Sequence, residues 1–127
     1  MVLRPLNELA VLAFTLFTLM MVSVQAQAQT FDAGDLKYQV VSGTNTVKVK
    51  GLASGFTGTG IEIPSTVSHS DNGTTTTYTV ATIDRDAFQG NTSLISVDIG
   101  DSVTTIGQGA FQGNTSLISV DIGDSVT

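Results

Sequence analysis

The sequence of 127 residues contains no cysteine. This absence excludes disulfide bonds, thiolate metal sites and the lipid-modified cysteine of a bacterial lipoprotein. A small domain without such supports must be held together by backbone pairing and apolar packing alone.

Positive charge is scarce beyond residue 28. The cations there are Lys37, Lys48, Lys50 and Arg85, against ten Asp and Glu side chains, so that the net charge is −6. Nucleic acids and anionic membrane surfaces are bound by clustered Lys and Arg. We therefore expect neither kind of partner.

Residue types that commonly catalyse reactions or bind metals are also scarce. His69 is the only histidine, and its neighbours Ser70 and Asp71 are consecutive in the chain, so their side chains point apart and form no catalytic triad. Glu62 is the only glutamate after residue 28, and no spacing suggests a zinc site. The sequence thus predicts a protein without catalytic, cofactor-binding or metal residues.

Long apolar runs are confined to the N-terminus. Leu9 to Val24 contains nothing more polar than threonine and serine, Arg4 precedes it, and Ala26-Gln27-Ala28 follows it. The run is short for a membrane span but suits the core of a signal peptide followed by a cleavage site. We expect residues 1–28 to be a signal peptide that is removed on export; a retained membrane anchor is the alternative.

The rest of the chain contains an internal repeat. The segment 87–104 recurs without one change as the segment 110–127, which gives a period of 23. Leu94, Val97 and Ile99 have the Leu-x-x-Leu-x-Leu spacing of leucine-rich repeats, and the period lies within the range of such repeats. The pattern predicts a solenoid in which Val97 and Ile99 point inward from a short strand.

The repeat resembles the BspA-type leucine-rich repeats of bacterial and some protist surface proteins. The residue pairs that carry the resemblance are Ile106-Gly107, Ala110-Phe111, Ser116-Leu117 and Ser125-Val126. The similarity covers residues 61–127. Asn91 or Asn114 falls near the cysteine usual in that family, and Gly100 or Gly123 replaces its usual proline, which Pro64 retains.

The expected organisation is mainly β, with a leucine-rich-repeat solenoid after a small β cap. We place the cap at residues 29–60, a degenerate turn at 61–82 with an insertion at 68–77, and repeats at 83–105 and 106–127, the last of them incomplete. Two hairpins are expected, one turning at Ser42 to Asn45 and one at Asp71-Asn72-Gly73. The identical repeats suggest an N-terminal fragment of a longer array or a recent repeat expansion.

One candidate binding face follows from the alternation of side chains on the repeat strand. Ser96 and Asp98 in one turn and Ser119 and Asp121 in the next would point outward. Stacked strands lie about 4.8 Å apart, so the aspartates would form an acidic row. Such a row could bind a basic protein surface or weakly held Ca²⁺, or it could be an ordinary solvated strand face.

The resemblance also implies a function, since members of the family are adhesins that bind host extracellular-matrix proteins or other bacteria. We therefore expect a secreted or cell-surface protein that binds a protein ligand, without enzymatic activity, without a cofactor and without a membrane span after signal cleavage. The alternatives are a structural spacer that displays a missing C-terminal domain and a non-catalytic module of a secreted hydrolase.

Overall fold

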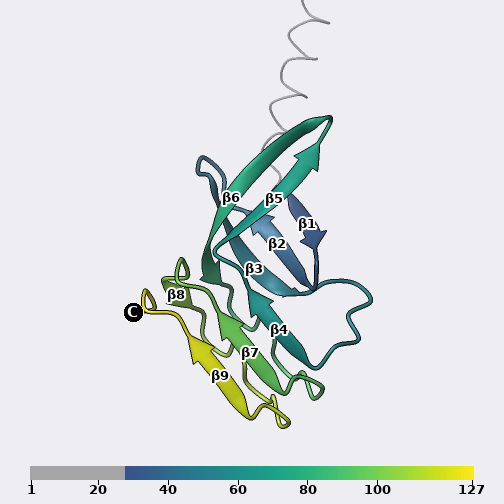
Figure 1. The fold of residues 1–127 in the computed structure, drawn as a ribbon, viewed down its shortest axis with the longest axis vertical. Coiled ribbons are helices and arrows are strands. Elements are labelled where there is room, and N and C mark those ends of the chain that lie inside the picture. The colour runs from purple at the N-terminus through teal and green to yellow at the C-terminus, as the bar shows by residue number, and fades with distance from the viewer. Residues whose placement is uncertain (1–27) are drawn as a thin grey trace, which may run out of the picture.

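The computed structural model describes residues 28–127, which form nine β-strands and no helix (Figure 1). The expected signal peptide, apart from residue 28, lies outside the described residues. Among residues 28–127 there is no helix of the length and apolarity that a membrane crossing needs. The strands are β1 (Thr30–Ala33), β2 (Leu36–Val40), β3 (Thr46–Leu52), β4 (Gly60–Ile63), β5 (Thr66–Asp71), β6 (Thr74–Ile83), β7 (Ser96–Ile99), β8 (Thr105–Ile106) and β9 (Ser119–Ile122).

Two sheets share these strands. The first has the order β1-β2-β3-β6-β5, with β8 paired to β6, and the second has the order β4-β7-β9. The second sheet is entirely parallel, and Figure 1 shows its three strands stacked side by side below the first sheet. The expectation of a mainly β fold with a leucine-rich-repeat solenoid is confirmed.

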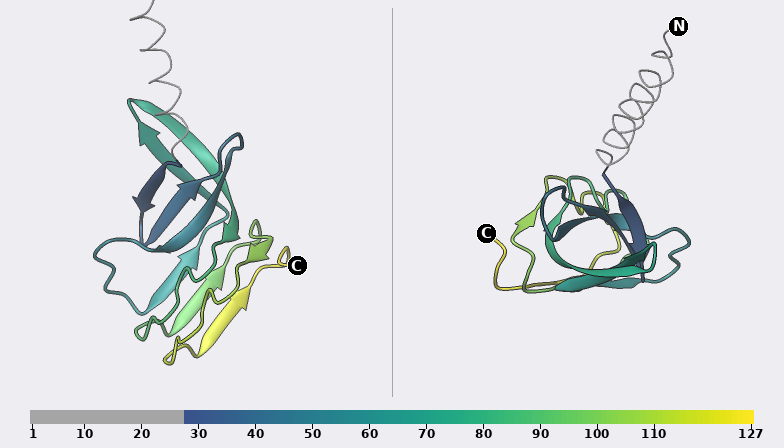
Figure 2. Two further views of the ribbon diagram at one scale, coloured as in Figure 1. Left: turned by 180° about the vertical axis from the view of Figure 1, so that it is seen from behind. Right: turned by 90° about the horizontal axis from the view of Figure 1, so that it is seen from above.

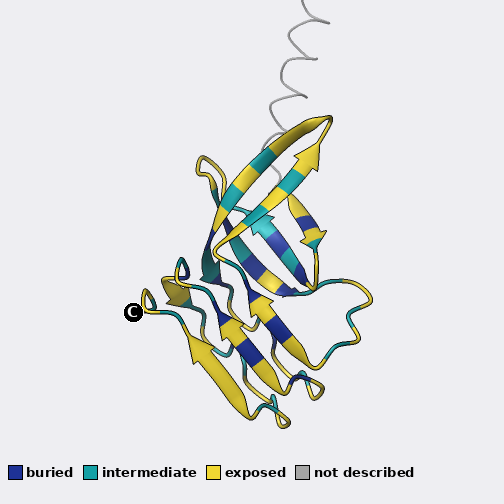
Figure 3. Ribbon diagram, in the orientation of Figure 1, coloured by how far each residue is buried: buried dark blue, intermediate teal, exposed yellow. Residues whose placement is uncertain are grey.

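The solenoid turns stack in a constant register. Val97 is aligned with Val120 and Ile99 with Ile122, so that equivalent residues of successive repeats lie on neighbouring strands. The same backbone hydrogen bond recurs in each turn, because Gly100 donates to Ile63 and Gly123 donates to Ile99. Val97 and Ile99 are buried, as their inward orientation predicts, whereas β9 is exposed along its whole length (Figure 3).

The first turn contains an inserted hairpin. Its strand residue Ile63 is aligned with Ile99, and Ile83, where the next repeat begins, is aligned with Ile106. The first turn is therefore longer than the second, and the β5–β6 hairpin accounts for the difference. The turn of this hairpin has φ of 50° at Asn72 and 81° at Gly73. Positive φ at both central positions is the geometry that Asn-Gly favours, as the sequence predicted.

The insertion changes which valine completes the first turn. By sequence pattern, Val67 corresponds to Val103, but Val67 is only half-buried. Val80 takes that place: it is fully buried, and the next residue, Ala81, accepts a hydrogen bond from the Thr104 amide. The chain leaves the solenoid after Ser65 and re-enters it at Val80, so the hairpin begins earlier than the sequence suggested.

The first sheet supplies the rest of the core. Leu36 and Tyr38 of β2 and Val47 and Val49 of β3 are buried, and the expected β2–β3 hairpin is present. Burial raises the pKa of Tyr38 to about 12. The first sheet contains strands from before and after residue 60 in the sequence. The boundary between the cap and the repeats, which the sequence places at that residue, remains a prediction.

The first sheet curls, which Figure 2 shows from above, and β5 therefore approaches β1. The His69 ring stacks on the Phe31 ring with 4.1 Å between centroids and an interplanar angle of 14°. His69 lies on the β5–β6 hairpin and is half-buried against this aromatic side chain. Its role is therefore packing between two strands.

Candidate binding face

The four candidate residues lie together on the outer face of the second sheet. Ser96 is aligned with Ser119, and Asp98 with Asp121, on the neighbouring strands β7 and β9. All four are exposed, because Val97, Ile99 and their equivalents take the inward positions. The structure thus brings the predicted residues into one row, while their role in binding remains a prediction.

A third carboxylate extends this row, and the sequence reasoning missed it. Glu62 of β4 is aligned with Asp98 and is exposed. The sequence did indicate this position, because Ile61-Glu62-Ile63 alternates apolar and acidic residues as Val97-Asp98-Ile99 does. We call Glu62, Asp98 and Asp121 the carboxylate row. Its members lie on adjacent strands, which are spaced about 4.8 Å apart.

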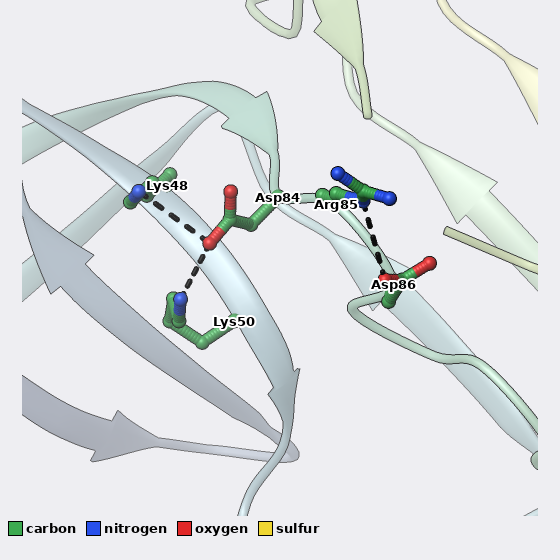
Figure 4. Close-up of polar contacts among 5 residues, drawn as sticks. All are labelled: Lys48, Lys50, Asp84, Arg85 and Asp86. Atoms are coloured by element: carbon green, nitrogen blue, oxygen red, sulfur yellow. Dashed lines mark hydrogen bonds and ion pairs between the residues drawn. The ribbon is translucent and has the colours of Figure 1, made fainter. Parts of the chain in front are cut away.

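Three of the four cations among residues 28–127 form ion pairs away from the carboxylate row. Lys50 Nζ lies 2.5 Å from Asp84 Oδ2 and Lys48 Nζ lies 3.4 Å from it, beside the first sheet (Figure 4). Arg85 pairs with Asp86. The hydrogen bond from Lys50 holds the pKa of Asp84 below its usual value despite partial burial.

Residues 86–127 differ in charge from the preceding part of the described chain, residues 28–85. Residues 86–127 contain five aspartates and neither lysine nor arginine. No ion pair within residues 28–127 reaches the carboxylate row, so its charges face solvent uncompensated. Like charges aligned across strands are mildly destabilising. A cationic group would relieve this repulsion, so the row attracts such groups.

An exposed isoleucine directly precedes the repeat strand in each of the two repeats. Ile95 directly precedes β7 and is 42% exposed, although its turn is covered on both sides by other turns. Its repeat equivalent Ile118 is 85% exposed. An exposed apolar residue therefore recurs at the same position of both repeats. The sequence alone did not single out these isoleucines, because the alternation assigns inward or outward positions only to residues within the strand.

The described residues show no arrangement suited to metal binding. No group of three or more His, Cys, Asp or Glu side chains within residues 28–127 could hold a metal ion. Neighbours in the carboxylate row come from different strands and are not drawn together around one point. The outer face of these strands is therefore a row of negative charges without a metal-binding cluster among the described residues.

Comparison with known proteins agrees with the leucine-rich-repeat fold described above. The family described as "BspA type Leucine rich repeat region (6 copies)" matches residues 62–127. No curated protein matches the chain. A leucine-rich repeat protein from Bacteroides ovatus is 30% identical with a TM-score of 0.67, and the match covers 76% of this chain and 24% of that one.

Two further solved structures are similar. A leucine-rich repeat protein from Bacteroides capillosus is 26% identical with a TM-score of 0.66, over 76% of this chain and 67% of that one. A leucine rich cell surface protein from Faecalibacterium prausnitzii is 29% identical with a TM-score of 0.61, over 78% of this chain and 24% of that one. The chain therefore spans about a quarter of two of these three proteins.

Proposed function

Because the chain belongs to the BspA-type leucine-rich repeat family, we propose that it is an exported or cell-surface protein that binds protein ligands and has no catalytic activity. The observation that carries the proposal is the alignment of Glu62, Asp98 and Asp121 on one exposed sheet face. A neighbour of this chain is described as a cell surface protein, which supports the proposed location.

The chemistry of the face defines the partner that fits it. Carboxylates at regular intervals attract a surface rich in lysine and arginine, and they steer it during encounter. Host extracellular-matrix proteins and proteins of other cell surfaces are the proposed ligands.

Neutralising the carboxylate row tests this proposal. A variant with Glu62→Gln, Asp98→Asn and Asp121→Asn keeps the shape of the face and removes its charge. We expect adhesion to immobilised basic matrix proteins to weaken roughly tenfold at low salt, the sum of three exposed charge pairs of about 0.5 kcal/mol each. The advantage of the wild type should shrink as salt rises, because exposed charges are screened within roughly 8 Å at physiological ionic strength.

A matched control is available in the turns after the strands. Asp101→Asn with Asp124→Asn removes two exposed carboxylates that are also repeat equivalents but lie off the row. This control should adhere almost as the wild type does. If the row variant adheres equally well while its thermal melt is unchanged, binding through this face is rejected, and the loops become the site to examine.

Export is tested separately at the N-terminus. We propose that residues 1–28 are a signal peptide, on the basis of the apolar run and Ala26-Gln27-Ala28. The protein recovered from its own host should begin at Gln29, with Gln27 as the alternative start, as read by N-terminal sequencing. An intact Met1 on cell-bound protein would instead establish a membrane anchor.

A further inference from the structure

The tip of the β5–β6 hairpin has the sequence Asn72-Gly73, and Figure 1 shows it projecting away from the second sheet. Asn72 is the only asparagine of the chain that is followed by glycine. Both residues are exposed, and a Cβ atom built at Gly73 would meet nothing within 4 Å. The space around the tip is therefore open to water.

The polar groups at the tip have no hydrogen-bond partner among residues 28–127. The Gly73 amide takes part in none of the backbone hydrogen bonds of the turns. The side-chain hydrogen bond next to the tip joins Ser70 and Thr75 and does not involve Asn72. No contact of the folded chain therefore keeps the Asn72 carboxamide away from the backbone nitrogen that follows it.

We propose that Asn72 is a self-modification site, at which the Gly73 backbone nitrogen attacks the side-chain carbon Cγ of Asn72. Hydroxide removes the amide proton, the bond from this nitrogen to Cγ forms, and the bond from Cγ to Nδ2 breaks. Ammonia leaves with a proton taken from water. Water then opens the resulting succinimide ring at one of its two carbonyl carbons, so that position 72 becomes aspartate or isoaspartate.

The residue after the asparagine decides which site reacts. Glycine has no Cβ atom to crowd the attacking nitrogen or to limit backbone rotation. The other asparagines of residues 28–127 are Asn45, Asn91 and Asn114, and each is followed by threonine, whose branched side chain crowds that nitrogen. We therefore expect modification at Asn72 alone.

Hydrogen bonds protect these other asparagines further. Asn91 Oδ1 accepts from the amides of Ser93 and Leu94. Asn114 Nδ2 donates to backbone carbonyls, among them that of Phe88 in the preceding turn. Both side chains are thus fixed by the repeat structure, whereas that of Asn72 is not.

The hairpin must open locally before the ring can close. Ring closure needs rotation about the Asn72 Cα–C bond, which the closed two-residue turn does not allow. Strand β6 pairs with β3 only from Thr79 onward, so its segment 74–78 pairs with β5 alone. A two-stranded ribbon is marginally stable by itself, so this end opens more readily than the rest of the sheet.

The product differs from the original tip in charge and in backbone length. Either product places a new carboxylate directly after Asp71, so that two like charges adjoin. Isoaspartate also adds one carbon atom to the main chain, which removes the two-residue geometry of the turn. The pairing of Asp71 with Thr74 closes the hairpin and would be lost first. Ring opening by water is irreversible, so the hairpin changes with time and with pH.

Ageing of the purified protein tests the site. Samples held at neutral and at mildly alkaline pH are digested and mapped by mass spectrometry, with isoaspartate detected by enzymatic methylation. The peptide that contains Asn72 should gain the mass of an amide-to-acid exchange. Its rate should rise roughly tenfold per pH unit, because the deprotonated fraction of a weak acid rises by that factor. Conversion of Asn45, Asn91 or Asn114 before Asn72 would overturn the assignment.

An exchanged tip is the matched control. Asn72→Gly with Gly73→Asn keeps the composition and a glycine-containing pair that hairpin turns use, but it places Thr74 after the asparagine. This variant should keep its amide under conditions in which the wild type is converted. If the two proteins convert equally fast, attack by the glycine nitrogen is not the step.

A disulfide across the ribbon tests the need for opening, because the chain has no cysteine of its own. The Thr79 amide donates to Asn45 and not to β5, so every second pair counted from Thr79 lacks backbone hydrogen bonds to β5, and Ser70–Thr75 is one of these. Cα atoms in such a pair lie about 4.5 Å apart, within disulfide range. Ser70→Cys with Thr75→Cys should convert several-fold more slowly when oxidised than when reduced. Equal rates in the two forms would overturn the opening step.

Discussion

Replacing Phe88 with alanine should lower the free energy of unfolding by about 3–5 kcal/mol, the cost of removing a buried aromatic ring from a packed core. Phe88 is only 3% exposed, and its ring stacks on that of Phe111 with 5.3 Å between centroids. Its backbone amide also donates to the carbonyl of Ala110, so the residue joins two turns through both ring and backbone. Urea unfolding followed by circular dichroism measures the loss.

The repeat supplies the control for this substitution. Phe111 is the equivalent residue one turn later, with the same neighbours in sequence, but it is only half-buried. Phe111→Ala should therefore cost less, about half as much, because less apolar area leaves a packed environment. Equal losses for the two variants would show that a covering turn does not determine the contribution of the ring.

Replacing Gly107 with alanine should cost about 2–4 kcal/mol, because the space for a Cβ atom is taken by backbone. A Cβ atom at this position would overlap the Arg85 backbone nitrogen and lie 2.7 Å from the Asp84 carbonyl carbon. Backbone atoms cannot rotate away, so the turns must separate. The hydrogen bond from the Gly107 amide to the Ile83 carbonyl, 2.8 Å long, would then be weakened.

Gly60→Ala is the matched control for crowding. A Cβ atom there would approach the Ser96 hydroxyl oxygen at 2.7 Å, but that hydroxyl ends an exposed side chain that can rotate. Its cost should stay within about 1 kcal/mol. Thermal melts of the two variants decide the question: if they shift equally, close backbone approach is not the reason for glycine at position 107.

The solenoid was predictable from the sequence because its evidence is local and repeated. Identical segments at a fixed spacing adopt equivalent backbone positions, and the alternation of Val97 and Ile99 with polar residues defines which side faces inward. The hairpins were predictable for a similar reason, since Asn72-Gly73 favours one turn type. The location of the candidate row followed from the same alternation.

Features that depend on contacts between distant segments were not predictable in this way. Both Val67 and Val80 suit the buried position of the first turn, and only the pairing of β6 with β3 and β8 selects Val80. The stacking of His69 on Phe31 depends on the curl of the first sheet, which no local pattern encodes. Glu62 joins the carboxylate row only once the register of β4 and β7 is known.

The ion pairs of Asp84 have a consequence for how the chain distinguishes its own repeats. The turns at 83–105 and 106–127 are nearly identical, so apolar packing alone hardly discriminates which of them stacks next to β3. Asp84 occupies the place that Gly107 holds one turn later, and only Asp84 offers a carboxylate to Lys48 and Lys50. The charged contact therefore selects the turn that lies beside the first sheet. An assembly in which one repeat is skipped is disfavoured, because it would lose these ion pairs.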